Sequence, residues 1–361
     1  MAQRTIVPFG PQHPVLPEPI HLDLVLEDEK VVQAIPSIGY VHRGLEGLAA
    51  KKDYHEMVYV AERICGICSF IHGMGYCTGV EALLKVEIPE RANRLRLILG
   101  ELSRIHSHIL WAGLFADAFG FESLFMHSWR VRELILDLLE EATGGRVIFG
   151  ICKVGGLRRD VDDAQLARML GKLDAVEQAC REITDPFVHD SSVKQRTVGV
   201  GLLSKAEAEL LGAVGPTLRG SGVSSDARRL GYAGYNNLKW EPIVETGGDC
   251  HARCLVRVRE IYQAFDLIRQ AMKDLPAGEV DAKIKPGLKP EGEYTARLEQ
   301  PRGEVVYYLK GNGTMNLERF RVRTPTFANV APLVKMLEGC QLADVPVIVL
   351  TIDPCISCTE R

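Results

Sequence analysis

Residues 89–119 read PERANRLRLILGELSRIHSHILWAGLFADAF, and this stretch sets the centre of the fold. It begins with a proline, whose missing N–H costs nothing at the start of a helix. Its apolar residues recur at helical spacing, which predicts a long core helix. The residues that carry this pattern are Leu95, Ile98, Leu99, Leu102, Ile105, Ile109 and Leu110.

Further helical patterns lie on both sides of this segment. They cover Tyr54–Lys85, residues 123–143, residues 160–184 and residues 251–273. The second is expected to begin with a Ser123 cap and to end at Gly144–Gly145, the residue types that favour helix starts and stops. Together these segments predict a bundle of long helices.

The two ends of the chain change period. Residues 20–35 alternate apolar and polar side chains around a turn at Glu27–Lys30, which predicts a β-hairpin. Pro and Gly become frequent over 276–303, and short β-type runs follow at Val305–Leu309 and Val345–Ile352. We predict a predominantly helical α+β fold in a single domain, 1–361. Its parts are an N-terminal β segment (1–50), the bundle (51–275) and a C-terminal segment (276–361).

Composition excludes some classes of function. The 361 residues are 46% hydrophobic and 25% charged, as in ordinary globular proteins. A net charge of −4 offers no basic surface for nucleic acid. The longest apolar runs fall short of the ~20 residues of a membrane-spanning helix, and the first residues show no secretory leader. We therefore expect a cytoplasmic protein whose attachment to a membrane, if any, comes through partner subunits.

Four of the ten cysteines form two C-x-x-C pairs, Cys65/Cys68 and Cys355/Cys358. Each pair puts two sulfurs on one side of a turn, so the two pairs can complete a four-thiolate metal site. Pairs of a zinc ribbon sit ~15–20 residues apart, whereas nearly the whole chain separates these. Spacing alone leaves a structural zinc site, an iron–sulfur cluster and a catalytic soft-metal centre open.

The residues around these pairs resemble a known family. R-x-C-G-x-C-x-x-x-H (Arg63 to His72) and D-P-C-x-x-C (Asp353 to Cys358) resemble the paired signature of [NiFe] hydrogenase large subunits. Arg43–Glu46, Pro301–Gly303 and Pro325–Thr326 extend the likeness. Gly10–Pro14 and Gly155–Asp160 instead resemble the quinone-site subunit of respiratory complex I. The combination resembles the membrane-bound, energy-converting hydrogenases of the Ech and CO-induced type.

This resemblance implies the metal ligands and the reaction. Cys65 and Cys355 would be terminal nickel ligands, and Cys68 and Cys358 would bridge nickel to an iron that carries CO and two cyanides. The implied reaction is reversible heterolytic cleavage of H₂, with proton reduction as the expected direction.

The resemblance also assigns roles around the metals. Glu18 would take the proton from Cys355, although a surface loop residue between two prolines is the alternative. Arg302 would lie over the open face of the metal pair, and its alternative is an exposed loop arginine. Thr326 would donate a hydrogen bond to a cyanide, or it would be a turn residue, and Pro325 is assigned to the same cofactor site.

Two further residues are assigned with open alternatives. His72 would orient a bridging sulfur, or it is a satisfied core histidine. Glu46 matches a second site for magnesium or iron that in the family also uses a terminal histidine. Arg361 stands here instead, and a guanidinium has no lone pair for a metal, so Glu46 could pair with Arg361.

The implied partners are a small subunit with a [4Fe-4S] cluster, a ferredoxin-like subunit and ion-translocating membrane subunits. They would hold the chain at the cytoplasmic face of the membrane. Two rival functions remain: a metal-free quinone-site subunit of a complex I-like enzyme, and a zinc-stabilised scaffold. The quinone-site subunit has no use for four paired cysteines or for a glutamate at position 18.

Overall fold

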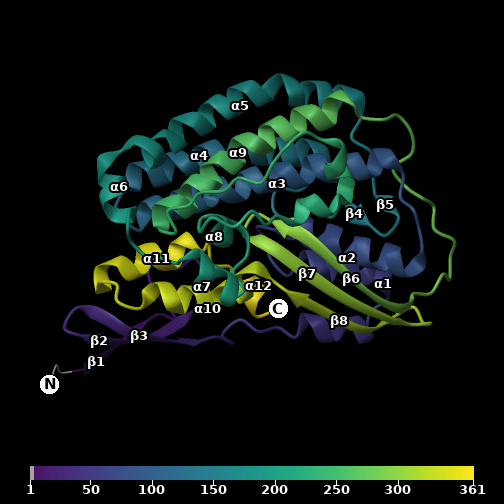
Figure 1. Cartoon of the computed structure of the whole chain (residues 1–361). Coiled ribbons are helices and arrows are strands. Elements are labelled where there is room, and N and C mark those ends of the chain that lie inside the picture. Colours follow the sequence, from purple (N-terminus) through teal and green to yellow (C-terminus); the bar gives the residue numbers. More distant parts are fainter. Residues whose placement is uncertain (1–3) are drawn as a thin grey trace.

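The computed structural model describes residues 4–361, and a layer of long helices forms its upper half in Figure 1. Helix α3 (Glu90–Asp117) is buried along almost its whole length. It packs between α4 (Glu122–Thr143) and α9 (Cys250–Lys273), while α5 (Asp163–His189) covers α4 and α9. The segment 89–119 therefore is the central core helix that its sequence predicts.

Two three-stranded antiparallel sheets lie in the lower half of Figure 1, below the layer of long helices. The N-terminal sheet has the order β1 (Arg4–Phe9), β2 (His21–Glu27), β3 (Lys30–Ser37). The predicted hairpin at Glu27–Lys30 is confirmed. The second sheet is a meander of β6 (Glu291–Gln300), β7 (Gly303–Asn312) and β8 (Leu317–Arg323).

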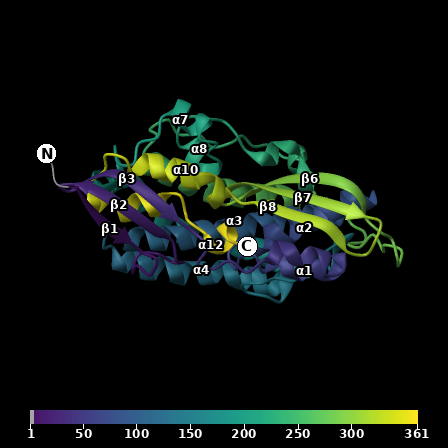
Figure 2. The ribbon, with the colours of Figure 1, turned by 90° about the horizontal axis from the view of Figure 1, so that it is seen from below.

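The remaining elements connect the helical layer to the sheets. They are η1 (Leu45–Ala50), α1 (Tyr54–Glu62), α2 (Ser69–Leu84), β4 (Cys152–Lys153), β5 (Gly156–Leu157), α6 (Ser191–Thr197), α7 (Lys205–Leu210), α8 (Gly215–Arg219), η2 (Ala227–Leu230), η3 (Tyr232–Asn237), α10 (Pro325–Leu337), η4 (Leu342–Asp344), α11 (Val345–Thr351) and α12 (Ile356–Thr359). Figure 2 shows α12 and the end of the chain near the middle of the molecule, with the N-terminal sheet on one side and the second sheet on the other.

Three local predictions are wrong. Residues 54–85 form two helices because the chain breaks at 63–68, where the first cysteine pair lies. Residues 345–352 form helix α11 rather than a strand. It packs against α3 and α9, and a fully buried apolar run has no period that separates helix from strand. Phe121, not Ser123, is the N-cap of α4, although Gly144 ends that helix in the left-handed conformation as predicted.

The predicted α+β class with a helical majority is confirmed. Within residues 4–361, no helix combines the length and apolar character that crossing a lipid bilayer requires. The division into one domain with three parts stays a prediction.

Candidate metal centre

The structure brings the two ends of the chain together at four sulfurs. Cys65 Sγ lies 3.3 Å from Cys355 Sγ, and Cys68 Sγ lies 3.4 Å from Cys358 Sγ. The four side chains are at most 3% exposed. Sulfurs of Cys65, Cys355 and Cys358 lie within 4.8 Å of one another, close enough to share an ion. The two pairs that the sequence singles out therefore form one buried cluster.

The first pair lies in the break between α1 and α2. Cys68 is the N-cap residue of α2, so the pair is fixed by the start of a core helix. The guanidinium of Arg43 donates to the Arg63 and Ile64 carbonyls, and His106 Nε2 lies 3.0 Å from the Ile67 carbonyl oxygen. Backbone contacts on both sides of the loop thus set the direction of its sulfurs.

The second pair is positioned by hydroxyl groups. The Cys355 N–H donates to Thr326 Oγ1 at 3.1 Å, and Thr324 Oγ1 donates to the Cys358 carbonyl at 3.1 Å. Pro325 occupies the first turn of α10 and is buried between these threonines. Thr326 makes no further hydrogen bond within residues 4–361, so the donor role toward a cyanide stays a prediction.

The chemistry of the sulfurs fits a soft divalent metal. Burial alone would raise the pKa of Cys68, but hydrogen bonds from Cys355, Cys358 and Cys65 lower it well below its ordinary value. Burial and the neighbouring sulfurs raise the pKa of Cys358 well above its ordinary value. Four buried thiols at this distance cannot all ionise unless a cation is among them, and thiolates are the ligands that nickel and iron accept.

His72 lies against the sulfurs, as expected from its place one turn after the first pair. Its Nε2 is 3.3 Å from Cys358 Sγ, and its Nδ1 is 3.0 Å from the Tyr307 hydroxyl. The Gln300 side-chain amide lies 3.2 Å from the same Nε2. Tyr307 and Gln300 come from the second sheet, and no sequence motif identifies either of them because only the meander brings them to His72.

Arg302 is buried beside the cluster and is not an exposed loop residue. Its Nε donates to the Asp353 carbonyl at 2.8 Å, and its Nη2 lies 2.8 Å from the Asp353 carboxylate. Burial alone would lower the pKa of Arg302, but Asp353 and the cysteine sulfurs raise it well above its ordinary value. Arg302 Nη1 is buried without a partner in the described part of the chain, so one donor remains free beside the sulfurs.

Glu18 reaches the second pair from the loop between β1 and β2. Its carboxylate accepts from the Ile356 N–H, from the Ser357 N–H at 3.0 Å and from the Ser357 hydroxyl. Glu18, Cys65, Cys355 and Arg302 line one cavity of about 450 Å³, whose apolar wall includes Leu110, Leu114 and Trp129. Glu18 therefore lies at the site and is not a free surface residue.

Glu46 does not have the surroundings of a metal ligand. Arg361 Nε donates to its carboxylate at 2.9 Å, the Val322 N–H donates at 2.8 Å, and Arg321 Nε lies 3.4 Å away. Two guanidinium groups already neutralise this carboxylate, so the residues present do not fit a second metal ion. The alternative pairing of Glu46 with Arg361 is the one observed.

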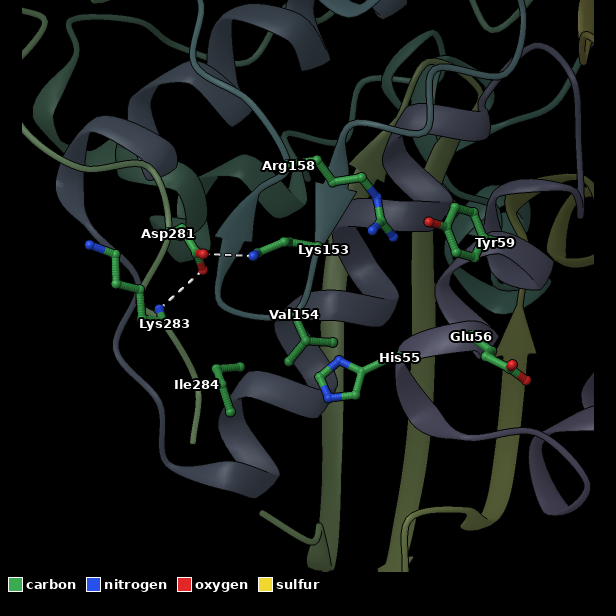
Figure 3. Close-up of a pocket in the computed structure, with 9 residues that line it drawn as sticks. All are labelled: His55, Glu56, Tyr59, Lys153, Val154, Arg158, Asp281, Lys283 and Ile284. Atoms are coloured by element: carbon green, nitrogen blue, oxygen red, sulfur yellow. Dashed lines mark hydrogen bonds and ion pairs between the residues drawn. The ribbon is translucent and has the colours of Figure 1, made fainter. Parts of the chain in front are cut away.

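A second cavity, of about 400 Å³, is lined by charged side chains and by none of the four cysteines. Figure 3 shows Asp281 between Lys153 and Lys283 on one side of this cavity and Arg158 beside Tyr59 on the other. Lys153 Nζ lies 2.7 Å from Asp281, and the Arg158 guanidinium lies 4.4 Å from the centre of the Tyr59 ring. Because these cations are matched by partners, this cavity is a weaker candidate site.

Two protein families match the chain. Residues 118–289 and 283–361 match the respiratory-chain NADH dehydrogenase 49 Kd subunit family. Residues 43–113, which include the first cysteine pair, match the nickel-dependent hydrogenase family. The two matches lie on different parts of one chain, as the mixed sequence motifs predict.

Individual relatives show the same two groups. The membrane-bound hydrogenase subunit alpha of Pyrococcus furiosus is 38% identical over 98% of this chain and 87% of its own length. The carbon monoxide-induced hydrogenase of Rhodospirillum rubrum is 39% identical over 98% and 99% of the two chains. An NADH-quinone oxidoreductase subunit of Desulforamulus reducens is 35% identical over 96% and 95%.

Proposed function

The chain belongs to the family that unites the large subunits of membrane-bound hydrogenases with the 49-kDa subunits of NADH dehydrogenases, and we propose that it is a hydrogenase catalytic subunit. The proposed reaction is the reversible heterolytic cleavage of H₂, run mainly as proton reduction. The observation that carries the proposal is the meeting of Cys65, Cys68, Cys355 and Cys358 in one buried cluster.

The four cysteines would hold a nickel and an iron that bears CO and cyanide ligands. When bound, such a centre supplies the redox chemistry and the open coordination position that H₂ cleavage needs. Burial of the sulfurs supports this assignment, because a buried thiolate cluster excludes water from the reacting position.

Arg302 would act as a fixed cation beside the open position. Its hydrogen bonds to Asp353 hold the guanidinium in place, and the free Nη1 can donate to a ligand of the iron. A preorganised donor in a dry site stabilises developing charge without reorganising. Asp353 is thus a positioning residue for Arg302.

Glu18 would exchange a proton with Cys355. Its carboxylate is held by the two residues that follow Cys355, which keeps it beside the thiol within the shared cavity. A carboxylate within hydrogen-bonding reach of a reacting group can serve as a general base. On the other side of the cluster, His72 would donate its Nε2–H to Cys358 while Nδ1 accepts from Tyr307.

Electrons would pass to an iron–sulfur cluster in a separate small subunit. Within residues 4–361, the cysteines outside the metal centre form no group that could hold such a cluster. We propose a ferredoxin-like donor, ion-translocating membrane subunits and a place at the cytoplasmic face of the membrane. The relative named as a membrane-bound hydrogenase supports the membrane association.

A quinone-site subunit without metal is the second candidate, since a relative named as an NADH-quinone oxidoreductase subunit is 35% identical. The buried sulfur cluster favours the hydrogenase, because a metal-free subunit has no need for four thiols in contact. Metal analysis of the purified complex decides between them. Nickel and iron near one each, with infrared bands of metal-bound CO and cyanide, support the hydrogenase; zinc alone or no metal contradicts it.

A further inference from the structure

A network of buried charges lies beside Gln300, whose backbone carbonyl accepts a hydrogen bond from Arg104. Its members are joined by ion pairs between α3, α8, α9, η2 and β6, and each side chain is at most 1% exposed. They are Glu101, Arg104, Arg219, Asp226, Arg228, Glu260 and Glu299. Four carboxylates therefore face three guanidinium groups in a region without solvent.

The shortage of positive charge falls on Glu299. Arg219 serves three carboxylates, at 2.6 Å from Glu260, 2.7 Å from Glu299 and 3.6 Å from Asp226. Asp226 also has Arg228 at 2.7 Å, whereas Glu299 has only the Ala227 N–H at 3.0 Å. An ionised carboxylate without its own counter-charge is costly to bury, so a proton is the simplest compensation.

The other titratable groups around the network do not contact the Glu299 carboxylate in the described part of the chain. His108 lies 2.9 Å from Glu260, but burial lowers its pKa, which favours the neutral ring. Arg257, one turn from Glu260 on α9, makes no ion pair in the described part of the chain, and its guanidinium lies 4.7 Å from the centre of the Trp111 ring. The Tyr235 hydroxyl donates to Glu101. Burial, together with the charge of Asp226, raises the pKa of Glu299 to about 7.

The backbone of Glu299 contacts a residue that lines a cavity, and the next residue contacts His72. Its backbone N–H donates to the Tyr232 hydroxyl at 3.0 Å, and Tyr232 lines a cavity of about 280 Å³ that also includes Asn93 and Tyr294. The next residue, Gln300, lies 3.2 Å from His72 Nε2, which is 3.3 Å from Cys358 Sγ. The main chain at residues 299 and 300 thus lies between this cavity and the histidine at the cluster.

We propose that Glu299 is a second internal proton site of this enzyme, separate from Glu18 and filled through the Tyr232 cavity. This inference rests on the proposed function, because its role is to balance charge when the metal centre gains or loses electrons. The step is a proton exchange. A hydronium ion in the cavity breaks one O–H bond and leaves water, while one O–H bond forms on the Glu299 carboxylate; the proton returns to a water molecule as hydronium when the charge reverses. No electrons move at Glu299.

Infrared spectroscopy of the purified complex, in H₂O and D₂O, tests the proton directly. The wild type should lose a protonated-carboxyl C=O band as pH rises through about 7, and Glu299→Gln should lack that band. Subtraction isolates it, because Glu62 also titrates near 7 and stays in both proteins. H/D exchange with D₂ should slow by about tenfold or more in Glu299→Gln, within the range of lost acid–base groups.

Glu62→Gln is the matched control, since Glu62 is a buried carboxyl with no contact to His72 among the described residues. It should remove its own band and leave the exchange rate unchanged. If Glu299→Gln does not assemble, Tyr232→Phe is the second variant, because it removes the hydroxyl at the cavity and keeps the ring. After a pH jump, the Glu299 carboxyl band should change more slowly in this variant than in the wild type. Two outcomes overturn the proposal. In the first, the wild type has no titrating carboxyl band that disappears in Glu299→Gln. In the second, Glu299→Gln and Glu62→Gln exchange H/D with D₂ at equal rates. Absence of nickel and of the CO and cyanide bands would instead overturn the hydrogenase assignment, which the carboxyl band does not test.

Discussion

The two cysteine pairs contribute equally to the cluster but are built in different ways. Cys65 and Cys68 lie between two helices of the core, and local backbone structure sets their sulfurs. Cys358 lies on the four-residue helix α12 and Cys355 is the N-cap residue of that helix, which is too short to be stable by itself. The first half of the site is therefore part of the fold, while the second half depends on contacts from distant segments.

Residues 39–43 provide many of those contacts, and we call this segment the strap. The Gly39 and Val41 N–H groups donate to the Glu360 carboxylate at 2.6 and 2.5 Å, and Arg43 donates to the Ser357 carbonyl at 2.9 Å. The site thus combines a rigid half, Cys65 and Cys68, with a fastened half, Cys355 and Cys358, which is held in place by hydrogen bonds from the strap.

The largest effect should come from a ligand of the fastened half. Cys355→Ser should lose nickel and hydrogen evolution completely while the helical core stays folded, because the fold does not depend on this sulfur. Circular dichroism, metal analysis and a hydrogen assay measure the three properties. Cys254→Ser is the matched control, as Cys254 is buried in α9 away from the site. A variant with normal nickel content would show that Cys355 is not a ligand.

The next effect concerns the proton path. Glu18→Gln should keep nickel, iron and the infrared bands but slow proton exchange about 10²–10⁴-fold, the usual loss for a positioned acid–base group. The amide can still accept from the Ser357 N–H, so the fastened half should stay in place. Isotope exchange between D₂ and water is the measurement. An unchanged exchange rate would remove Glu18 from the mechanism.

Glu62 tests the half of the site that belongs to the fold, because it ends helix α1 just before the first cysteine pair. Burial raises its pKa from 4.5 to about 7, and both carboxylate oxygens are buried without a side-chain partner in the described residues. The folded state then binds more protons than the unfolded state between these pH values, so this group makes stability fall as pH rises through that window. At 1.36 kcal/mol per pKa unit, the loss reaches roughly 3 kcal/mol above pH 7.

Glu62→Gln should therefore stabilise the protein at alkaline pH and have little effect below about pH 4.5, the ordinary value for Glu62. Thermal unfolding across this pH range checks the sign. Equal melting temperatures of variant and wild type at alkaline pH would mean that Glu62 is ionised and compensated in the folded state.

The smallest effect should come from the strap. Glu360→Gln replaces one carboxylate oxygen by an amide NH₂, so either the Gly39 or the Val41 N–H loses its acceptor. The contact between the strap and α12 should weaken by about 1–3 kcal/mol. Because the contact fastens only the second half, nickel should be lost faster to a chelator while global stability changes little. Glu338→Gln, on the surface outside the strap, is the control. Equal nickel loss in the two variants would show that the strap does not hold α12.

The sequence predicts the parts of this site that carry a local signature. The two C-x-x-C pairs, Arg302 and Glu18 stand in motifs, and all of them are at the cluster. The central helix is predicted because its apolar period is long. The fully apolar run 345–352 has no such period, and its helical form depends on packing against α3 and α9.

The remaining residues of the site have no sequence signature, and they share one reason for this. Gln300, Tyr307 and Glu299 reach the site only because the meander folds against α2 and α3, and no spacing in the sequence encodes that contact. Asp353 stands in the second motif, but its pairing with Arg302 joins residues far apart in the chain. Long-range side-chain contacts are set by tertiary packing, which a local pattern does not contain.

The strap also determines how long the site retains what it binds. All four sulfurs are buried and the end of α12 is held by the strap, so we expect an ion to leave when residues 353–361 detach locally, an event with a lower free energy than global unfolding. When detachment is the slow step, the dissociation rate equals the opening rate and does not depend on the strength or concentration of a competing chelator. Residence time is then a kinetic property of this terminal segment and not of the metal–sulfur bonds alone.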